Sequence, residues 1–114
     1  MICFNDIIRL LSVDLKNKYC IEILFSVKEN TKYQHCWMGK MPDKSKEGKY
    51  VYWFGLVSDG SEAYDYDCLS DFISTPVFEG KSLKDVWDYV KVLEIDGCDP
   101  EWRLQNYLNK EWLL

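Results

Sequence analysis

Apolar and polar side chains alternate most clearly in residues 49–67, KYVYWFGLVSDGSEAYDYD, which predict a β-hairpin. Residues 50–57 are rich in aromatic and β-branched side chains, and residues 62–67 alternate acid with aromatic. Between these two arms, Asp59-Gly60 favours a type I′ turn, because that turn needs positive φ at both central residues.

A loop with an even number of residues sets the predicted register of this hairpin and divides its side chains between two faces. Val57 then lies opposite Glu62. One face is expected to join the core, with the ring of Tyr64 across Gly55, and it carries Val51, Trp53, Gly55, Val57, Tyr64 and Tyr66. The other face mixes rings with carboxylates and carries Tyr50, Tyr52, Phe54, Leu56, Ala63, Asp65 and Asp67. A three-residue loop would exchange the faces of one arm relative to the other.

The rest of the chain alternates between helical and strand periodicity. Helical spacing of apolar residues, with capping residues before it, predicts helices over residues 4–15, 68–74, about 82–89 and from 99 onward. Alternation or apolar runs predict strands over residues 19–27, 33–38 and 90–95. Residues 39–48, GKMPDKSKEG, have no apolar pattern and predict an exposed, lysine-rich loop.

These elements follow the order α-β-β-β-β-α-α-β-α. Adjacent strands joined by short turns favour an antiparallel sheet with helices gathered on one face or at one end. We therefore expect a single α+β domain over residues 1–114, with a mainly antiparallel sheet of four to five strands packed by three to four helices. The pairing of the last strand, residues 90–95, stays open at this point.

Charge narrows the choice of partner. The chain has a net charge of −5, a pI of about 4.8 and only 14 lysines and arginines among 114 residues, which argues against nucleic acid as a partner. The same acidity suits a basic protein partner, because complementary potentials speed association.

Cysteine and histidine usage predicts neither a disulfide framework nor a metal or cofactor site. Five cysteines occur without a CxxC pair, and His35 is the only histidine, so no tetrahedral zinc spacing can be drawn. An odd number of widely spaced thiols indicates a reducing compartment. The start of the chain lacks the pattern of a signal peptide, and no apolar stretch has the length of a membrane span. We expect a cytoplasmic protein that does not bind membranes.

Catalytic patterns are weak in this sequence. His35 and Cys36 are adjacent, but neighbours on a strand point to opposite faces, so they cannot form a catalytic pair with each other. The carboxylates of Asp65, Asp67 and Asp71 are close in sequence, but they lack the spacing of a calcium loop and are interpreted as a strand edge and a helix cap. No catalytic residue is assigned.

The remaining candidate is the mixed face of the hairpin. Tyr50, Tyr52, Asp65 and Asp67 would place amphipathic rings beside anionic acceptors, a composition suited to Lys or Arg side chains of a partner. The sequence therefore predicts a small non-catalytic binding module for a basic protein, of which an immunity or antitoxin-like inhibitor is one form. The alternative is an enzymatic, metal-binding or small-molecule-binding domain with a pocket between sheet and helices, converging on His35 or Asp65. The apolar end, Trp112, Leu113 and Leu114, suggests an oligomer interface as a further possibility.

Overall fold

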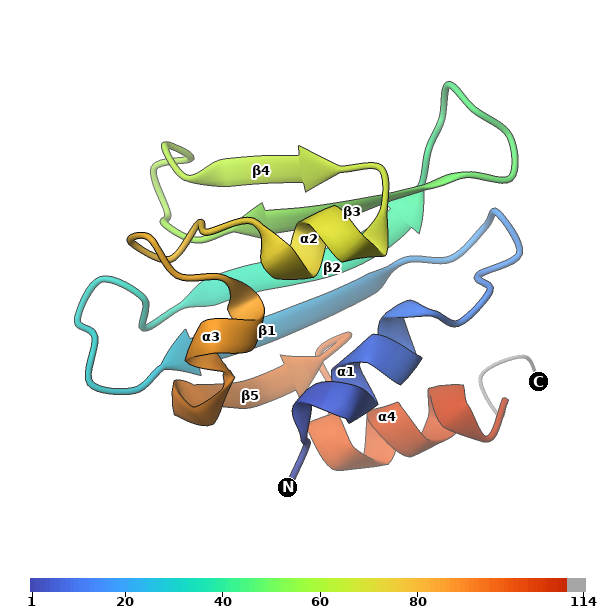
Figure 1. Ribbon diagram of the computed structural model, residues 1–114. Helices are drawn as coiled ribbons and strands as arrows, with labels where there is room; N and C mark the ends of the chain where they lie inside the picture. Colours follow the sequence, from blue (N-terminus) through green and yellow to red (C-terminus); the bar gives the residue numbers. More distant parts are fainter. Residues whose placement is uncertain (111–114) are drawn as a thin grey trace.

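A computed structural model, which describes residues 1–110, contains one five-stranded antiparallel sheet and four α-helices (Figure 1). The predicted element order and α+β class are confirmed. The elements are α1 (Phe4–Leu11), β1 (Ile21–Val27), β2 (Cys36–Pro42), β3 (Tyr50–Gly55), β4 (Ala63–Tyr66), α2 (Leu69–Ser74), α3 (Leu83–Val86), the 3₁₀ turn η1 (Trp87–Tyr89), β5 (Val90–Ile95) and α4 (Pro100–Leu108). No helix within residues 1–110 is long and apolar enough to cross a bilayer.

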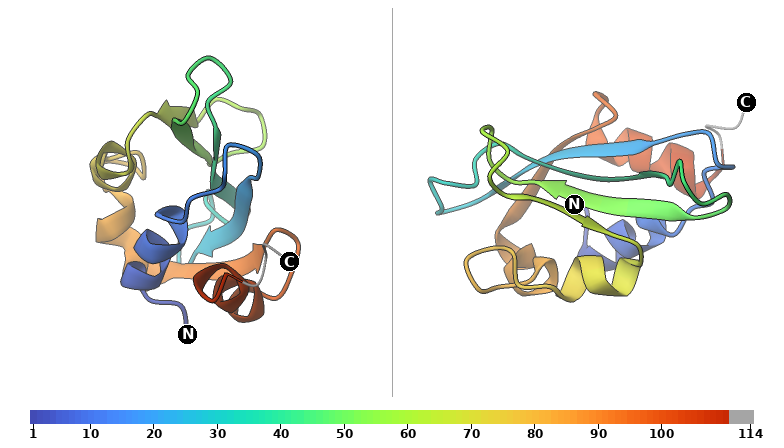
Figure 2. Two further views of the ribbon diagram at one scale, coloured as in Figure 1. Left: turned by 90° about the vertical axis from the view of Figure 1, so that its right-hand side faces the viewer. Right: turned by 90° about the horizontal axis from the view of Figure 1, so that it is seen from above.

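The strands lie in the order β4-β3-β2-β1-β5. β5, whose partner the sequence left open, pairs antiparallel with β1, with an irregularity between Leu24 and Phe25. Figure 2 shows α1, α2 and α3 on one side of the sheet, while α4 lies beneath β5. The sheet therefore has an inner face covered by helices and an outer face without a helix over it.

The core fills the space between the inner face and the helices. Each strand sends every second side chain into it, as the alternating burial of β1 shows. An aromatic cluster forms its centre, where Phe54 stacks on Phe72 with ring centroids 4.1 Å apart and Phe78 meets Phe54 edge to face at 5.5 Å. Tyr33, in the turn before β2, packs on Phe78 at 5.5 Å. Aromatic pairs in such geometries each contribute about 0.5–1.5 kcal/mol beyond the area that they bury.

Helix starts are where the sequence was most informative. Ser82 accepts a hydrogen bond from the Asp85 N–H, and the Asp85 carboxylate accepts one from the Ser82 N–H, which confirms the predicted capping box. Asp99 caps α4 at the Trp102 N–H, with Pro100 in the first turn as predicted. α2 is capped by the Cys68 thiol rather than by Asp67 as predicted.

Two predicted boundaries are wrong. α1 ends at Leu11 rather than at residue 15, although Leu15 remains fully buried in the turn that follows. β2 begins at Cys36 and runs through Pro42, so the first part of the predicted loop 39–48 is strand and contains two buried residues, Gly39 and Lys40. The strand continues because Gly39 to Pro42 pairs with β3, although the segment has no apolar pattern in the sequence.

The register of the central hairpin also differs from the prediction. Phe54 lies opposite Tyr64 and Tyr52 opposite Tyr66, one residue away from the expected pairs. The Leu56 N–H donates to the Glu62 carbonyl and closes the hairpin, which leaves residues 57–61, an odd number, in the loop. Gly60 has a φ of 79° but Asp59 does not have a positive φ, so the turn is not type I′. As a result, one arm has its faces exchanged relative to the prediction.

Candidate functional site

The outer face of the sheet carries large apolar side chains that no helix of the described chain covers (Figure 2). Pairing places these residues on one surface, because directly opposite residues of an antiparallel pair share a face. We use the name outer face for the surface formed by the side chains of Leu24, Trp37, Met41, Val51, Trp53 and Asp65. Met41 and Asp65 are exposed, and the other four side chains are partly buried by one another and by the strands beneath.

Two tryptophans of the outer face each lie opposite a glycine. Trp53 pairs with Gly39, and Trp37 pairs with Gly55. The Trp53 ring lies so close to Gly39 that a Cβ there would stand 2.8 Å from it, and only 2.1 Å from the Ile21 carbonyl oxygen. The sequence predicted a ring covering a strand glycine, but it assigned Tyr64 to Gly55, and that pairing is wrong. The observed arrangement instead spreads two indole rings over β2 and β3.

Acidic side chains border these rings. Asp65 lies directly opposite Trp53, and Glu22 lies opposite Gly39. Glu94 lies opposite Leu24 at the β5 side, where Lys91 contributes a positive charge opposite Ser26. All four charged side chains are exposed. The outer face therefore combines indole rings with a carboxylate-rich border.

The four residues predicted to bind a partner are divided between the two faces of the sheet. Tyr50 and Tyr52 point to the inner face, where Tyr52 packs against Phe72 with centroids 6.1 Å apart. Asp65 belongs to the outer face, and Asp67 follows β4 as an exposed residue. The predicted common surface of these four residues is wrong, because the odd loop exchanges the faces. Whether any of them contacts a partner stays a prediction.

Tyr50 instead helps to hold a buried lysine, the functional group that the sequence reading missed. Lys40 is 2% exposed, and its Nζ donates to the Leu11 carbonyl at 2.8 Å and to the Val13 carbonyl at 2.7 Å. The Tyr50 ring lies 4.4 Å from Nζ. Burial lowers the pKa of Lys40 to about 8, which the negative charge of Asp14 partly opposes.

The Lys40 amine has a structural role, because its partners are the carbonyl of Leu11, the last residue of α1, and the carbonyl of Val13 in the turn that follows. Tyr50 supports the same segment: its hydroxyl donates to Asp14 at 2.7 Å and accepts from the Leu15 N–H at 3.1 Å. The apolar Met41 after Lys40 was a sequence signal that the strand continues past Gly39, but it does not indicate that Lys40 is buried.

His35 and Cys36, the adjacent base and thiol considered from sequence, have side chains in different environments, one exposed and one buried, and do not pair with each other. Cys36 is fully buried, donates to the Leu56 carbonyl at 3.4 Å, and has a pKa raised to about 11 by burial. His35 is exposed, with its ring 5.9 Å from that of Trp37. A protonated, buried thiol is a poor nucleophile, so Cys36 packs as a small apolar residue.

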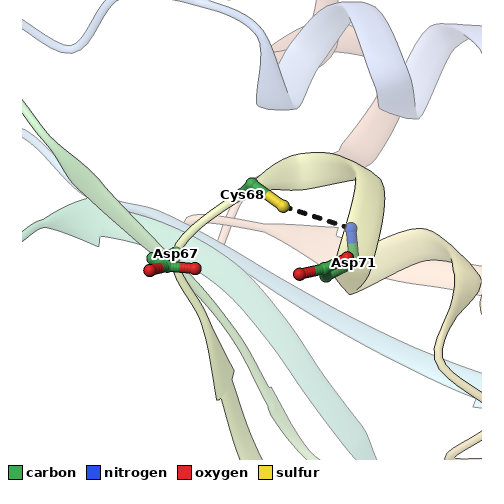
Figure 3. A group of neighbouring side chains, drawn as sticks. All are labelled: Asp67, Cys68 and Asp71. Atoms are coloured by element: carbon green, nitrogen blue, oxygen red, sulfur yellow. Dashed lines mark hydrogen bonds between the residues drawn. The ribbon is translucent and has the colours of Figure 1, made fainter.

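One group of potential metal ligands occurs among the described residues, where β4 leads into α2 (Figure 3). Ligand atoms of Asp67, Cys68 and Asp71 all lie within 4.8 Å of one another, and all three side chains are exposed. Asp65, part of the acidic group considered from sequence, is not among them. The Cys68 thiol accepts the Asp71 N–H at 3.4 Å and so begins α2. This group is explained by helix capping, and it supplies one fewer ligand than a tetrahedral structural site requires.

Three surface cavities have volumes of about 570, 390 and 340 Å³. None of the three is lined by His35 or Asp65, the residues on which the predicted alternative pocket would converge. The cavity of about 390 Å³ lies on the inner side of β4, between Tyr64 and Tyr66 and the segment from Thr75 to Gly80.

Beside this cavity, Glu62 accepts the Tyr33 hydroxyl at 2.8 Å and pairs with Lys32. Tyr33 has its pKa raised to about 12, first by burial and then by this hydrogen bond. The Glu62 carboxylate at this cavity is therefore already engaged.

No family model matches the chain, and the searches of curated proteins and of solved structures found no match. Function has to be argued from the geometry alone.

Proposed function

We propose that this protein is a non-catalytic binding module that holds a basic protein partner, of which an immunity or antitoxin-like inhibitor is one form. The observation that carries the proposal is the outer face, where no helix of the described chain covers the half-buried rings of Trp37 and Trp53, and the carboxylates of Asp65 and Glu22 are exposed beside them. Indole rings give the strongest cation–π contacts with Lys and Arg, and tryptophan is enriched among residues that dominate binding energy.

The charge of the whole molecule supports the same class of partner. A net charge of −5 attracts a basic protein at long range and raises the association rate. Compared with the sequence prediction, the proposed surface keeps Asp65 and replaces the tyrosines by the tryptophans of the outer face.

Capture of a partner from native lysate, with the full chain as bait, tests this function. Trp37→Ala and Asp65→Lys are expected to weaken capture by roughly tenfold or more, and the remaining binding should fall as salt is raised. Trp102→Ala and Asp88→Lys are matched controls, because Trp102 is 57% exposed on α4 and Asp88 is exposed in η1, both off the outer face. Capture that all four variants reduce equally, or that is insensitive to salt, would refute the proposal.

A further inference from the structure

β4 is an edge strand whose free side has no partner within residues 1–110. The Leu56 N–H bonds to the Glu62 carbonyl, and inward and outward groups alternate along an antiparallel strand. The N–H and C=O groups of Ala63 and Asp65 therefore point away from β3, toward the free edge. No hydrogen bond to them occurs in the described part of the chain, and Figure 1 shows β4 as the outermost strand.

The two faces of this edge differ in chemistry. On the inner side, Tyr64 and Tyr66 line the cavity of about 390 Å³ together with Pro76 and Val77. On the outer side, the small Ala63 and the exposed carboxylate of Asp65 lie next to Trp53. A strand added to β4 would place alternate side chains toward the tyrosine-lined cavity and toward Asp65.

Charge selects among the possible occupants. Antiparallel pairing of β4 with β4 of a second copy would bring the Asp65 carboxylates of both chains to one side of the joined sheet, with Asp67 of each nearby. Like charges at such positions oppose pairing, and acidic residues on an edge strand are a known protection against self-association. A strand with Lys or Arg on its outer side has the complementary charge.

We infer that β4 takes up an extended segment of the basic partner as a sixth strand of the sheet, and that this segment alternates apolar with Lys or Arg residues. Main-chain hydrogen bonds to Ala63 and Asp65 supply affinity, and the two faces of the edge supply specificity. This inference rests on the proposed function and specifies how the partner is held.

A synthetic peptide in which valine and lysine alternate tests the inference, with binding to the full chain measured by calorimetry. A peptide of the same composition with the valines and the lysines in separate blocks is the control for pattern, and a fully N-methylated peptide is the control for backbone bonding. We expect the alternating peptide to bind roughly tenfold or more tightly than either control and to slow hydrogen exchange at the Ala63 and Asp65 amides.

Ala63→Pro removes one outward N–H, while Ala63→Val keeps it and suits a strand. We expect the first variant to lose about tenfold in affinity and the second to bind like the wild type. Equal binding by both variants, with equal binding of the N-methylated peptide, would overturn strand addition and leave binding on the outer face through Trp37 intact. Failure of the alternating peptide and of every basic protein to bind would overturn both proposals.

Discussion

β5 and β4 are the two edges of one sheet, and they differ in what lies beside them. β5 is flanked by α4, and a polar network fastens its end: Asp96 accepts from Arg103 Nε at 3.0 Å, from the Tyr107 hydroxyl and from the Glu22 N–H at 2.9 Å. β4 has only four residues and carries the exposed carboxylate of Asp65. No strand of the described chain pairs with its free edge. An edge strand can be protected from pairing with another chain by a helix or loop packed over it, or by charged side chains along it. In this fold, α4 packs beside one edge of the sheet, whereas the exposed carboxylate of Asp65 lies at the other.

The comparison extends to the backbone spacing on the two sides of the sheet. Gly39 lies in β2 against β1, and Gly55 lies in β3 toward the open edge. A Cβ at Gly39 would stand 2.1 Å from the Ile21 carbonyl oxygen, whereas a Cβ at Gly55 would meet nothing closer than Trp37 at 4.0 Å. Gly39→Ala should therefore destabilise the protein by about 3 kcal/mol, the top of the usual range for overpacking. Gly55→Ala is the matched control and should be neutral in urea denaturation; similar losses for both would contradict the difference in spacing.

One substitution at each edge compares how much the side-chain contacts of the β5 edge and of the β4 edge contribute to the free energy of unfolding. Asp96→Ala leaves Arg103 and the buried Tyr107 hydroxyl without their shared acceptor and should cost about 3 kcal/mol of unfolding free energy. Asp65→Ala should leave stability close to that of the wild type, because that side chain is exposed and makes no ion pair within the described residues. Thermal and urea denaturation of the two variants would measure these changes in unfolding free energy. A larger loss for Asp65→Ala than for Asp96→Ala would contradict the proposed difference between the two edges.

Lys40, in the middle of the sheet, tests how β2 holds α1. Lys40→Met should cost about 2 kcal/mol at pH 7, because the Leu11 and Val13 carbonyls lose their donor. With a folded pKa of about 8 against 10.5 in the unfolded chain, the unfolded chain binds more protons between these values. Stability of the wild type relative to Lys40→Met should therefore rise as the pH increases from 8 to 10.5. A relative stability that falls over this range, measured by urea denaturation, would show that the buried amine is preferentially charged.

The smallest effect is expected at the ligand group beside β4. Zinc should shift the melting temperature by less than roughly 1 °C, because Asp67, Cys68 and Asp71 are exposed and supply an incomplete ligand set. Cys68→Ser is the control, since serine keeps the helix cap and removes the sulfur ligand. A zinc-dependent stabilisation of several degrees that Cys68→Ser abolishes would make the open edge a metal site.

Local signals in the sequence predicted the elements and their order, because each depends on a few adjacent residues. Ser82 and Asp99 began helices as expected, and Asp59-Gly60 formed a hairpin turn. The predicted register was wrong because it required a loop with an even number of residues and positive φ at both Asp59 and Gly60. In the structure only Gly60 has positive φ, and the Asp59 carboxylate accepts hydrogen bonds from the Ser61 N–H and hydroxyl within a loop with an odd number of residues.

The candidate site was correspondingly only half predictable. Asp65 lies beside an aromatic ring as predicted, but the odd loop places the half-buried Trp53 there instead of Tyr50 and Tyr52. Lys40 could not be placed from sequence, since its environment is built by α1 and Tyr50, both distant along the chain. The proposed interface at Trp112, Leu113 and Leu114 lies outside the described residues and remains a prediction.

Because Lys40 is buried under α1, its chemical reactivity can report how often α1 separates from β2. Every other lysine is exposed and should be acylated promptly by an amine-reactive reagent, whereas Lys40 can react only after α1 separates from β2. Mass spectrometry of the modified chain would then resolve one late acylation whose rate measures that separation. Repeating the measurement with the alternating peptide present would report whether occupation of the β4 edge stabilises the contact between α1 and β2.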